Sequence, residues 1–227
     1  STWVLSNHDV VRHASRLALT AENPQGHGIG PRSEGRPIAD LGLRRARAAS
    51  ALMLALPGSA YLYQGEELGL PEAIDIPDDA RQDPTWFRTG GERYGRDGCR
   101  VPLPWTAADP AYGFSPTGAT WLPQPADWSV LARDVQAADP ASTLSLYTTL
   151  LAERRARGLG GGTLEWIDGF EADVIAFRNG NVSVVANLGA APIDVSELVG
   201  GGRIVAATVD GDGVVLPSDA TIWVARD

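Results

Sequence analysis

Apolar runs and one helical pattern alternate in the first part of the chain. Thr2–Ser6 and Ala60–Gln64 are short, mostly apolar runs of the kind expected for buried strands. Between them, Asp40 is a candidate N-cap for a helix over Leu41–Leu56, which Pro57-Gly58 ends. Strand, helix and strand in this order predict a βαβ unit, in which the two strands are parallel and joined by a right-handed crossover.

The pattern weakens after Gly65. A stretch of about 60 residues follows with little periodicity, and segments of that length are usually functional loops. Helical patterns return at Trp128–Ala137 and then from Asp139-Pro140, a helix-start signal, to about Arg157. The apolar face expected for this last helix is formed by Leu144, Tyr147, Leu150 and Leu151.

The final third of the chain has a different pattern. Gly158–Gly162 is a helix stop and an expected hinge, and Asn179-Gly180 is a strong hairpin signal between two β-rich runs. The β-rich runs lie at 164–167, 174–178, 182–188, 203–209 and 221–225. We therefore expect two domains, an α/β part over residues 1–157 and a small antiparallel β-sandwich over residues 158–227.

Composition fits a folded protein and excludes several classes. The 227 residues are 44% hydrophobic and 21% charged, with a net charge of −9, which argues against nucleic acid or an anionic membrane as partner. The longest apolar stretch, Ala51–Tyr63, is broken by Pro57-Gly58 and is too short to span a bilayer. A single cysteine, Cys99, excludes an internal disulfide framework.

The N-terminus and the basic residues add two expectations about origin. The chain starts inside a predicted strand, with no initiator Met and no signal-peptide pattern, so we expect the later part of a longer, cytoplasmic protein. All 19 basic residues are Arg and none is Lys, a bias typical of a GC-rich coding sequence and hence of a bacterial source. The lack of Lys excludes Schiff-base chemistry and a P-loop lysine.

Polar residues cluster after both predicted parallel strands. Asn7-His8-Asp9 and Arg12 follow the first strand, and Gln64–Glu67 follow the second. Because the carboxyl ends of parallel strands form the active face of α/β folds, we expect these residues at one rim. The long loop adds Arg96–Arg100 and three aromatic residues, Trp86, Tyr94 and Trp105. Carboxylates, arginines and exposed aromatic faces together suit a polyhydroxylated ligand such as a sugar.

Each of these features also has a structural interpretation. Asn7-His8-Asp9 is as compatible with turn formation as with catalysis, and for Glu66-Glu67 we favour a structural role. Among the three histidines, His8 and His13 are five residues apart and His27 lies in a loop, so we expect no metal site. Cys99 has no evident catalytic partner and is expected to pack inside the loop.

Three segments resemble glycoside hydrolase family 13, the α-amylase family. Trp3–Arg12 (Trp-Val-Leu-Ser-Asn-His-Asp-Val-Val-Arg) resembles its fourth conserved region. Leu56–Gly69, with Gln-Gly-Glu-Glu, is similar to the eighth-strand segment of its α-glucosidase and oligo-1,6-glucosidase members. Arg96–Trp105 resembles a further signature of the same subgroup. The resemblance implies that the chain begins at strand seven of a (β/α)₈ barrel and continues through strand eight into a C-terminal β-sandwich.

The resemblance also implies roles for individual residues. Asp9 matches the third catalytic carboxylate, which stabilises the transition state, and His8 matches a histidine that binds the same sugar. Arg96 matches the arginine that holds the non-reducing glucose in exo-acting members, and Arg12 is a weaker substrate-binding candidate. Gln64–Glu67 are expected to shape the barrel rim.

The family's nucleophilic Asp and acid/base Glu have no counterparts in this sequence, because they come from strands that would precede Ser1. The implied activity, retaining hydrolysis of terminal α-linked glucose from oligosaccharides or disaccharides, therefore requires the missing N-terminal part of the barrel, and we expect the 227-residue chain alone to be inactive. No cofactor or metal is expected, since the family's calcium loop also lies upstream. Linkage preference stays open. The alternatives are trehalose synthesis, sucrose hydrolysis or transglucosylation by a member of the same family, and a catalytically dead family member that acts as a structural or partner subunit.

Overall fold

The computed structural model describes residues 1–23, 28–212 and 214–226. The chain divides into two compact units. The first unit contains Ser1–Val4, Arg44–Tyr61 and Ser145–Asp227, and the second contains Leu5–Leu43 and Leu62–Leu144. No helix within the described residues is long and apolar enough to cross a membrane.

The predicted parallel strand pair is present in the first unit. Strand β1 (Thr2–Val4) pairs in parallel with β2 (Ser59–Tyr61), and helix α2 (Ala39–Ala55) lies between them in sequence. Both strands are shorter than predicted. The backbone carbonyls that follow them have other partners, because Leu5 accepts a hydrogen bond from the Arg16 guanidinium and Gln64 accepts one from Arg12.

Two predicted helix starts are wrong. Helix α2 begins at Ala39, and the amide of Gly42 already donates to the carbonyl of Ile38, so Asp40 lies inside the first turn instead of capping it. There its negative charge still interacts favourably with the helix dipole. Asp139-Pro140 does not open the last helix either. The Asp139 carboxylate accepts from the amide of Ala141 and forms a turn.

Helix α5 (Thr143–Ala156) is instead capped by a side chain from the preceding helix, α4 (Arg133–Ala137). The Gln136 side-chain oxygen accepts from the amide of Leu144 at 3.2 Å, which satisfies one free donor of the first turn. The most buried apolar residues of α5 are Leu146, Tyr147 and Leu150, whereas Leu151 is 42% exposed and its predicted place in the apolar face is wrong.

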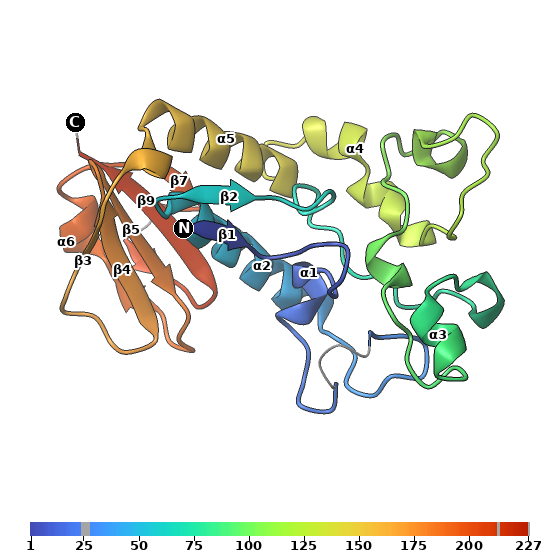
Figure 1. Ribbon diagram of the computed structural model, residues 1–227. Helices are drawn as coiled ribbons and strands as arrows, with labels where there is room; N and C mark the ends of the chain where they lie inside the picture. The colour runs from blue at the N-terminus through green and yellow to red at the C-terminus, as the bar shows by residue number, and fades with distance from the viewer. Residues whose placement is uncertain (24–27, 213, 227) are drawn as a thin grey trace. The chain divides into compact units, whose positions relative to one another are not determined.

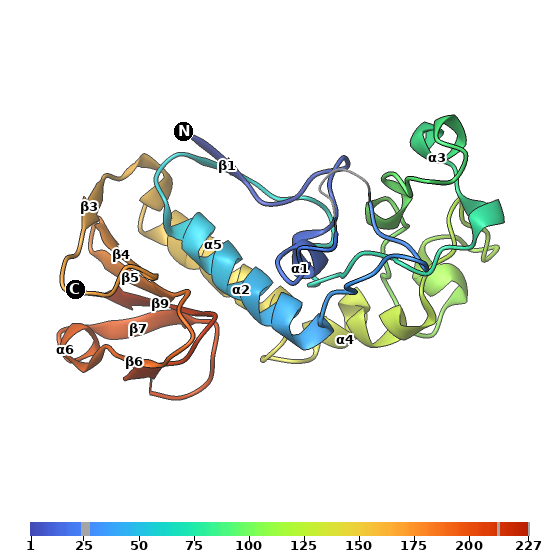
Figure 2. The same cartoon turned by 90° about the horizontal axis from the view of Figure 1, so that it is seen from below.

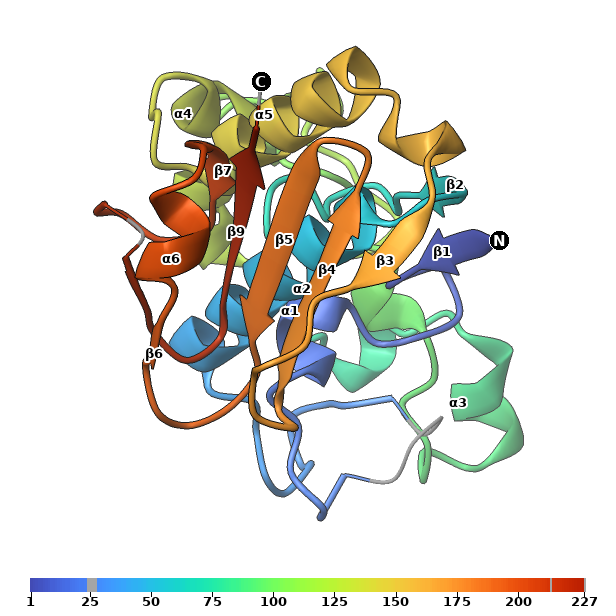
Figure 3. The same cartoon turned by 90° about the vertical axis from the view of Figure 1, so that its left-hand side faces the viewer.

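An antiparallel β-sheet forms the C-terminal part of the first unit, as predicted (Figure 3). Its strand order is β3-β4-β5-β9-β7. The strands are β3 (Leu164–Trp166), β4 (Val174–Asn179), β5 (Val182–Asn187), β7 (Arg203–Ala207) and β9 (Ala220–Ala225). A second, two-stranded antiparallel ladder, β6 (Ile193–Asp194) with β8 (Val215–Leu216), and the short helix α6 (Ser196–Val199) were not predicted.

Strands β5 and β9 are buried along their whole length because both faces of the sheet are covered. Val185, Ile222 and Val224 pack on one face with Leu216 of β8 and Leu198 of α6. On the other face, sheet side chains reach the backbone of α2.

Those contacts with α2 are hydrogen bonds to its carbonyl groups. Trp223 Nε1 donates to the carbonyl of Ala51 at 3.1 Å, and Thr221 Oγ1 donates to that of Ala48 at 3.0 Å. Both acceptor residues are alanines that are 1% exposed, and the small side chain lets the sheet approach the helix backbone closely. The Ala-rich sequence of α2 therefore serves packing as well as helix formation.

The C-terminal end of α2 is held by α5, which runs beside it within the first unit (Figure 2). The guanidinium of Arg154 donates to the carbonyls of Leu54, Leu56 and Gly58. Carbonyls at a helix end have no intrahelical partner, and a cation there also complements the helix dipole.

The second unit orders the segment that shows little periodicity in the sequence. It contains the short helices α1 (His13–Arg16), α3 (Pro84–Arg88) and α4, with 3₁₀ turns at Asp78–Ala80, Asp97–Cys99, Pro110–Gly113 and Ala126–Leu131 (Figure 1). A core of its own holds these turns together. That core contains Leu68, Leu70, Ile76, Val101, Leu122 and Trp128.

Candidate functional site

The Asn7–Asp9 turn shapes the first side of the candidate site, which lies entirely in the second unit. The side-chain oxygen of Asn7 accepts the amide of Asp9 at 2.8 Å, a local bond that mimics a backbone turn. Asn7 therefore acts as a turn residue. The bond fixes the backbone of Asp9 and does not involve its carboxylate.

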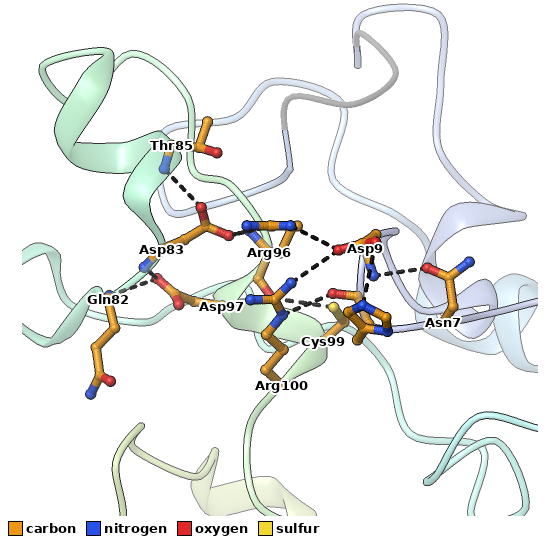
Figure 4. Close-up of polar contacts among 10 residues, drawn as sticks. Asn7, Asp9, Gln82, Asp83, Thr85, Arg96, Asp97, Cys99 and Arg100 are labelled. Atoms are coloured by element: carbon orange, nitrogen blue, oxygen red, sulfur yellow. Dashed lines mark hydrogen bonds and ion pairs between the residues drawn. The ribbon is translucent and has the colours of Figure 1, made fainter.

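The Asp9 carboxylate meets two arginines from a segment 87 and 91 residues further along the chain (Figure 4). Its Oδ1 accepts from Nη1 of Arg96 at 2.8 Å and from Nη2 of Arg100 at 3.1 Å. The Asp9 side chain is 51% exposed. The hydrogen bond from Arg96 is the main cause that lowers the pKa of Asp9, so the group is a carboxylate at neutral pH.

Arg96 is itself fixed from behind by Asp83. Oδ2 of Asp83 accepts from Nε of Arg96 at 2.6 Å and from its amide at 3.0 Å. Oδ1 of Asp83 accepts from the amide of Thr85 at 2.8 Å and thereby caps α3. Burial opposes ionisation of Asp83, but the bonds from Arg96 and Thr85 outweigh it and hold its pKa well below the usual range.

Asp97 supports this arrangement from the next turn of the loop. Its Oδ2 accepts from the amides of Gln82 at 2.9 Å and Asp83 at 3.1 Å, and the residue is 3% exposed. The carboxylates of Asp83 and Asp97 thus join the loop segments 82–85 and 96–100, because they accept hydrogen bonds from backbone amides and from the Arg96 guanidinium.

His8 lies at the open side of the site. Its Nε2 is 3.4 Å from Oδ2 of Asp9, and its side chain is 68% exposed. The backbone carbonyl of His8 accepts from Nε of Arg100 at 2.8 Å. The structure therefore brings together three residues singled out in the sequence, Asp9, His8 and Arg96.

Asp83 was missed as a site residue, and Arg100 was placed in the polar cluster with the Arg96–Arg100 segment but was given no role of its own. Nothing in the sequence near Asp83 indicates that its side chain faces Arg96, because that contact depends on how the loop folds back.

Arg12 lies behind the site and is 1% exposed. Its Nη1 donates to the carbonyl of Gln64 at 2.8 Å, and its Nη2 donates to that of Cys99 at 2.9 Å. Gly65, at φ +91°, allows this close approach, because a Cβ there would lie 2.6 Å from Nη1 of Arg12. Arg12 therefore joins the segment that follows β2 to the loop that carries Arg96 and Arg100.

The two glutamates after β2 differ from each other. Glu67 accepts from the amide of Gly65 at 2.8 Å, a contact that fits the structural role expected of it. Glu66 is 3% exposed, and its carboxylate lies beside Ser6, whose amide and hydroxyl offset only part of the effect of burial. Burial raises the pKa of Glu66 to about 7.

Two of the three aromatic residues expected to face a sugar have their ring faces occupied by protein. Trp86 and Tyr94 stack with ring centroids 5.5 Å apart, and the buried Arg81 guanidinium lies 4.4 Å from the Tyr94 ring centroid. Tyr94 is 8% exposed, so its predicted exposure is wrong. Trp105 is 49% exposed.

Among the described residues, no group of His, Cys, Asp and Glu could hold a metal ion. His13 is buried and contacts the Ser6 hydroxyl, and His27 lies outside the described residues. Cys99 is fully buried, as predicted, and burial raises the pKa of its thiol to about 12.

The segments that follow the parallel strand pair thus place a carboxylate against two arginines, an arrangement that suits a polyhydroxylated ligand on an α/β scaffold. The family model of the α-amylase catalytic domain matches residues 1–159. The chain belongs to the α-amylase family, glycoside hydrolase family 13, as its sequence motifs indicated.

Individual relatives agree with this assignment. A probable α-glucosidase of Rhizobium meliloti is 37% identical over 168 residues, which cover 73% of this chain and 26% of that protein. A trehalose synthase/amylase, TreS, of Mycobacterium tuberculosis is 31% identical over 66% of this chain and 23% of its own length. The solved structure of an α-glucosyl transfer enzyme, XgtA, is 31% identical and superimposes with a TM-score of 0.70, covering 100% of this chain and 40% of that one.

These comparisons settle the coarse fold class. The β1–α2–β2 region is part of a (β/α)₈ barrel, and a mostly antiparallel sheet follows it. The chain spans about a quarter of the length of the curated relatives it matches.

Proposed function

We propose that this chain supplies the sugar-binding side of the active site of a retaining, exo-acting α-glucosidase. The observation that carries the proposal is the Asp9–Arg96 pair, in which a half-exposed carboxylate is held at 2.8 Å by an arginine from a distant loop. An ionised carboxylate suits stabilisation of a positively charged, oxocarbenium-like transition state. The α-glucosidase relative, at 37% identity, supports this reaction class.

Each site residue has a distinct role in this proposal. Asp9 binds hydroxyl groups of the terminal glucose and stabilises the transition state, and the exposed His8 ring binds the same sugar. Arg96 donates to hydroxyls of the non-reducing glucose. Because Arg96 also donates to Asp9, its guanidinium and the sugar hydroxyls compete for the Asp9 carboxylate. A role for Arg12 in substrate binding stays a prediction, and its contacts with the carbonyls of Gln64 and Cys99 would make such a role indirect.

The bond-breaking carboxylates are proposed to lie outside this chain. Retaining hydrolysis needs a nucleophile and an acid/base about 5–5.5 Å apart. Asp9 is paired with two arginines, an environment that favours a permanent carboxylate and is unsuited to proton donation. We therefore expect no turnover from the 227-residue chain alone.

The proposal also assigns the parts of the fold. We take β1 and β2 as strands seven and eight of the barrel, with residues 1–157 as its C-terminal portion. Residues 158–227 form the C-terminal domain, for which two layers, the five-stranded sheet and the β6–β8 ladder, support a sandwich. The family match ends at residue 159, beside this boundary.

Product analysis of the full-length protein, meaning this chain with any segment encoded before Ser1, tests the proposal. Incubation with maltose, isomaltose and sucrose is expected to release glucose. Trehalose or a longer glucoside as the main product would favour the synthase or transfer activities named for TreS and XgtA. Absence of turnover on all three would favour a non-catalytic family member. Release of p-nitrophenol from an α-glucoside by the pure 227-residue chain would overturn its predicted inactivity.

A further inference from the structure

We propose that Asp83 is a positioning residue of the sugar site, which fixes the Arg96 guanidinium in the orientation that meets Asp9. This inference rests on the proposed function, since it takes Arg96 as a sugar-binding group. Asp83 itself does not touch substrate in this proposal, because its side chain is fully buried.

The contacts of Arg96 divide between a buried and an exposed carboxylate (Figure 4). Oδ2 of Asp83 accepts from Nε of Arg96 at 2.6 Å and from its backbone amide at 3.0 Å, so Asp83 fixes both the backbone and the guanidinium of Arg96. Nη1 is then directed to Oδ1 of Asp9 at 2.8 Å. A guanidinium is planar, and a bond to Nε therefore sets the direction of the remaining N–H groups.

The surrounding loop is built around the Asp83 carboxylate. Gly95 has φ +72°, and a Cβ at that position would lie 2.8 Å from Cγ of Asp83, so only glycine lets the 95–96 backbone approach so closely. The amide of Asp83 donates to the buried Asp97 carboxylate, and the amide of Thr85 donates to Oδ1 of Asp83. The position of the carboxylate is fixed from three sides before any ligand binds.

Electrostatics gives the arrangement a purpose in the proposed reaction. With Asp83 present, Arg96 is held at Nε and reaches Asp9 only through Nη1, at Oδ1, which leaves Oδ2 of Asp9 to sugar hydroxyls beside the His8 ring. Without the Asp83 charge, Arg96 loses the bond that sets its direction, and its guanidinium turns further onto the Asp9 carboxylate. Sugar would then have to displace that pair, which predicts weaker binding of glucose in the ground state as well as in the transition state.

The test uses Asp83→Asn in the full-length protein, because asparagine also caps helices and preserves the acceptor for Thr85. We expect KM for p-nitrophenyl α-glucoside to rise about tenfold, the order expected for a lost charge-assisted hydrogen bond, with kcat reduced less. Asp79→Asn, which removes an exposed carboxylate four residues earlier, is the matched control and should leave KM unchanged.

A double-mutant cycle separates positioning from a general structural effect. In an Arg96→Gln background, Asp83→Asn should change KM by less than about twofold, because its effect acts through the missing guanidinium. The same tenfold rise in both backgrounds, or a wild-type KM in Asp83→Asn, would overturn the proposal.

A readout that does not need activity keeps this inference separable from the proposed function. In full-length protein labelled with ¹⁵N-arginine, the Nε–H signal of Arg96, assigned by its loss in Arg96→Gln, should shift in Asp83→Asn and stay in place in Asp79→Asn. An unchanged Arg96 signal in Asp83→Asn overturns the positioning role even in an active enzyme. An inactive wild-type protein with the expected shift overturns only the glucosidase function.

Discussion

Arg96 donates a hydrogen bond to Asp9 across 2.8 Å although 87 residues separate them in the chain. Asp9 follows β1 and Arg96 belongs to the long irregular loop after β2, so the contact exists only because that loop folds back over the Asn7–Asp9 turn. The Asp9 side chain is 51% exposed, whereas the Asp83 carboxylate, which binds the Arg96 guanidinium at Nε, is fully buried. A charged group held in place and still open to solvent is what a polar ligand requires.

Asp9→Asn is expected to lower kcat of the full-length protein. The substitution keeps the shape of the side chain and removes the charge that would stabilise an oxocarbenium-like transition state. Loss of one preorganised electrostatic partner costs on the order of 10²–10³ in kcat, with a smaller change in KM. Steady-state kinetics on an aryl α-glucoside checks this, with Asp79→Asn as the control. A kcat within twofold of wild type would contradict the role assigned to Asp9.

The elements with strong periodicity were predictable from the sequence, and the loop was not. The helix over Ala39–Ala55 and the five main strands of the sheet follow from local patterns that agree with the fold. The short ladder β6–β8 was missed, because strands of two residues carry no periodic signal. Helix starts at Asp40 and Asp139 failed for a related reason, since the groups that set the boundaries, Ile38 and Gln136, are not typical cap residues.

The site was predictable only as far as motifs reach. Asp9, His8 and Arg96 stand in motifs whose resemblance suggested their roles, and the structure brings them together. Asp83 lies outside those motifs, and its contact with Arg96 depends on the conformation of the loop between them. Tyr94 was expected to offer its ring to a ligand, but Arg81 occupies that face, a pairing that residue types alone do not indicate.

Arg154→Ala is expected to destabilise the first unit. Its guanidinium donates to the carbonyls of Leu54, Leu56 and Gly58, and removal takes this donor from three carbonyls at and just after the end of α2. Hydrogen bonds to charged groups contribute about 1.5–3 kcal/mol, so we expect a loss of that order in the free energy of unfolding. Urea denaturation checks it. Arg155→Ala, the exposed neighbour on the same helix, is the matched control, and equal losses for the two variants would contradict the capping role.

Cys99 is expected to resist alkylation in the folded protein. It is fully buried, and burial raises the pKa of the thiol to about 12, so the reactive thiolate is scarce at pH 8. Native protein treated with iodoacetamide should yield an unmodified Cys99 peptide by mass spectrometry, and protein treated in denaturant should yield the fully modified one. Rapid modification under native conditions would mean that the loop around residues 97–99 opens readily.

Glu66→Gln is expected to change how stability depends on pH. Burial raises the pKa of Glu66 from an ordinary value of 4.5 to about 7, so between these values the folded state keeps a proton that the unfolded state has lost. The contribution of Glu66 to the free energy of unfolding therefore falls as pH rises through this window, by a total on the order of 2–3 kcal/mol. Glutamine carries no charge and removes that loss. Relative to wild type, Glu66→Gln should gain stability from pH 4.5 to pH 8, measured by urea denaturation at several pH values.

Glu72, whose pKa burial also raises to about 7, is present in both proteins, and its contribution cancels in the difference. Glu67→Gln controls for replacing a partly exposed carboxylate in the same loop. Parallel stability curves for wild type and Glu66→Gln across this range would show that Glu66 is ionised without penalty in the folded protein.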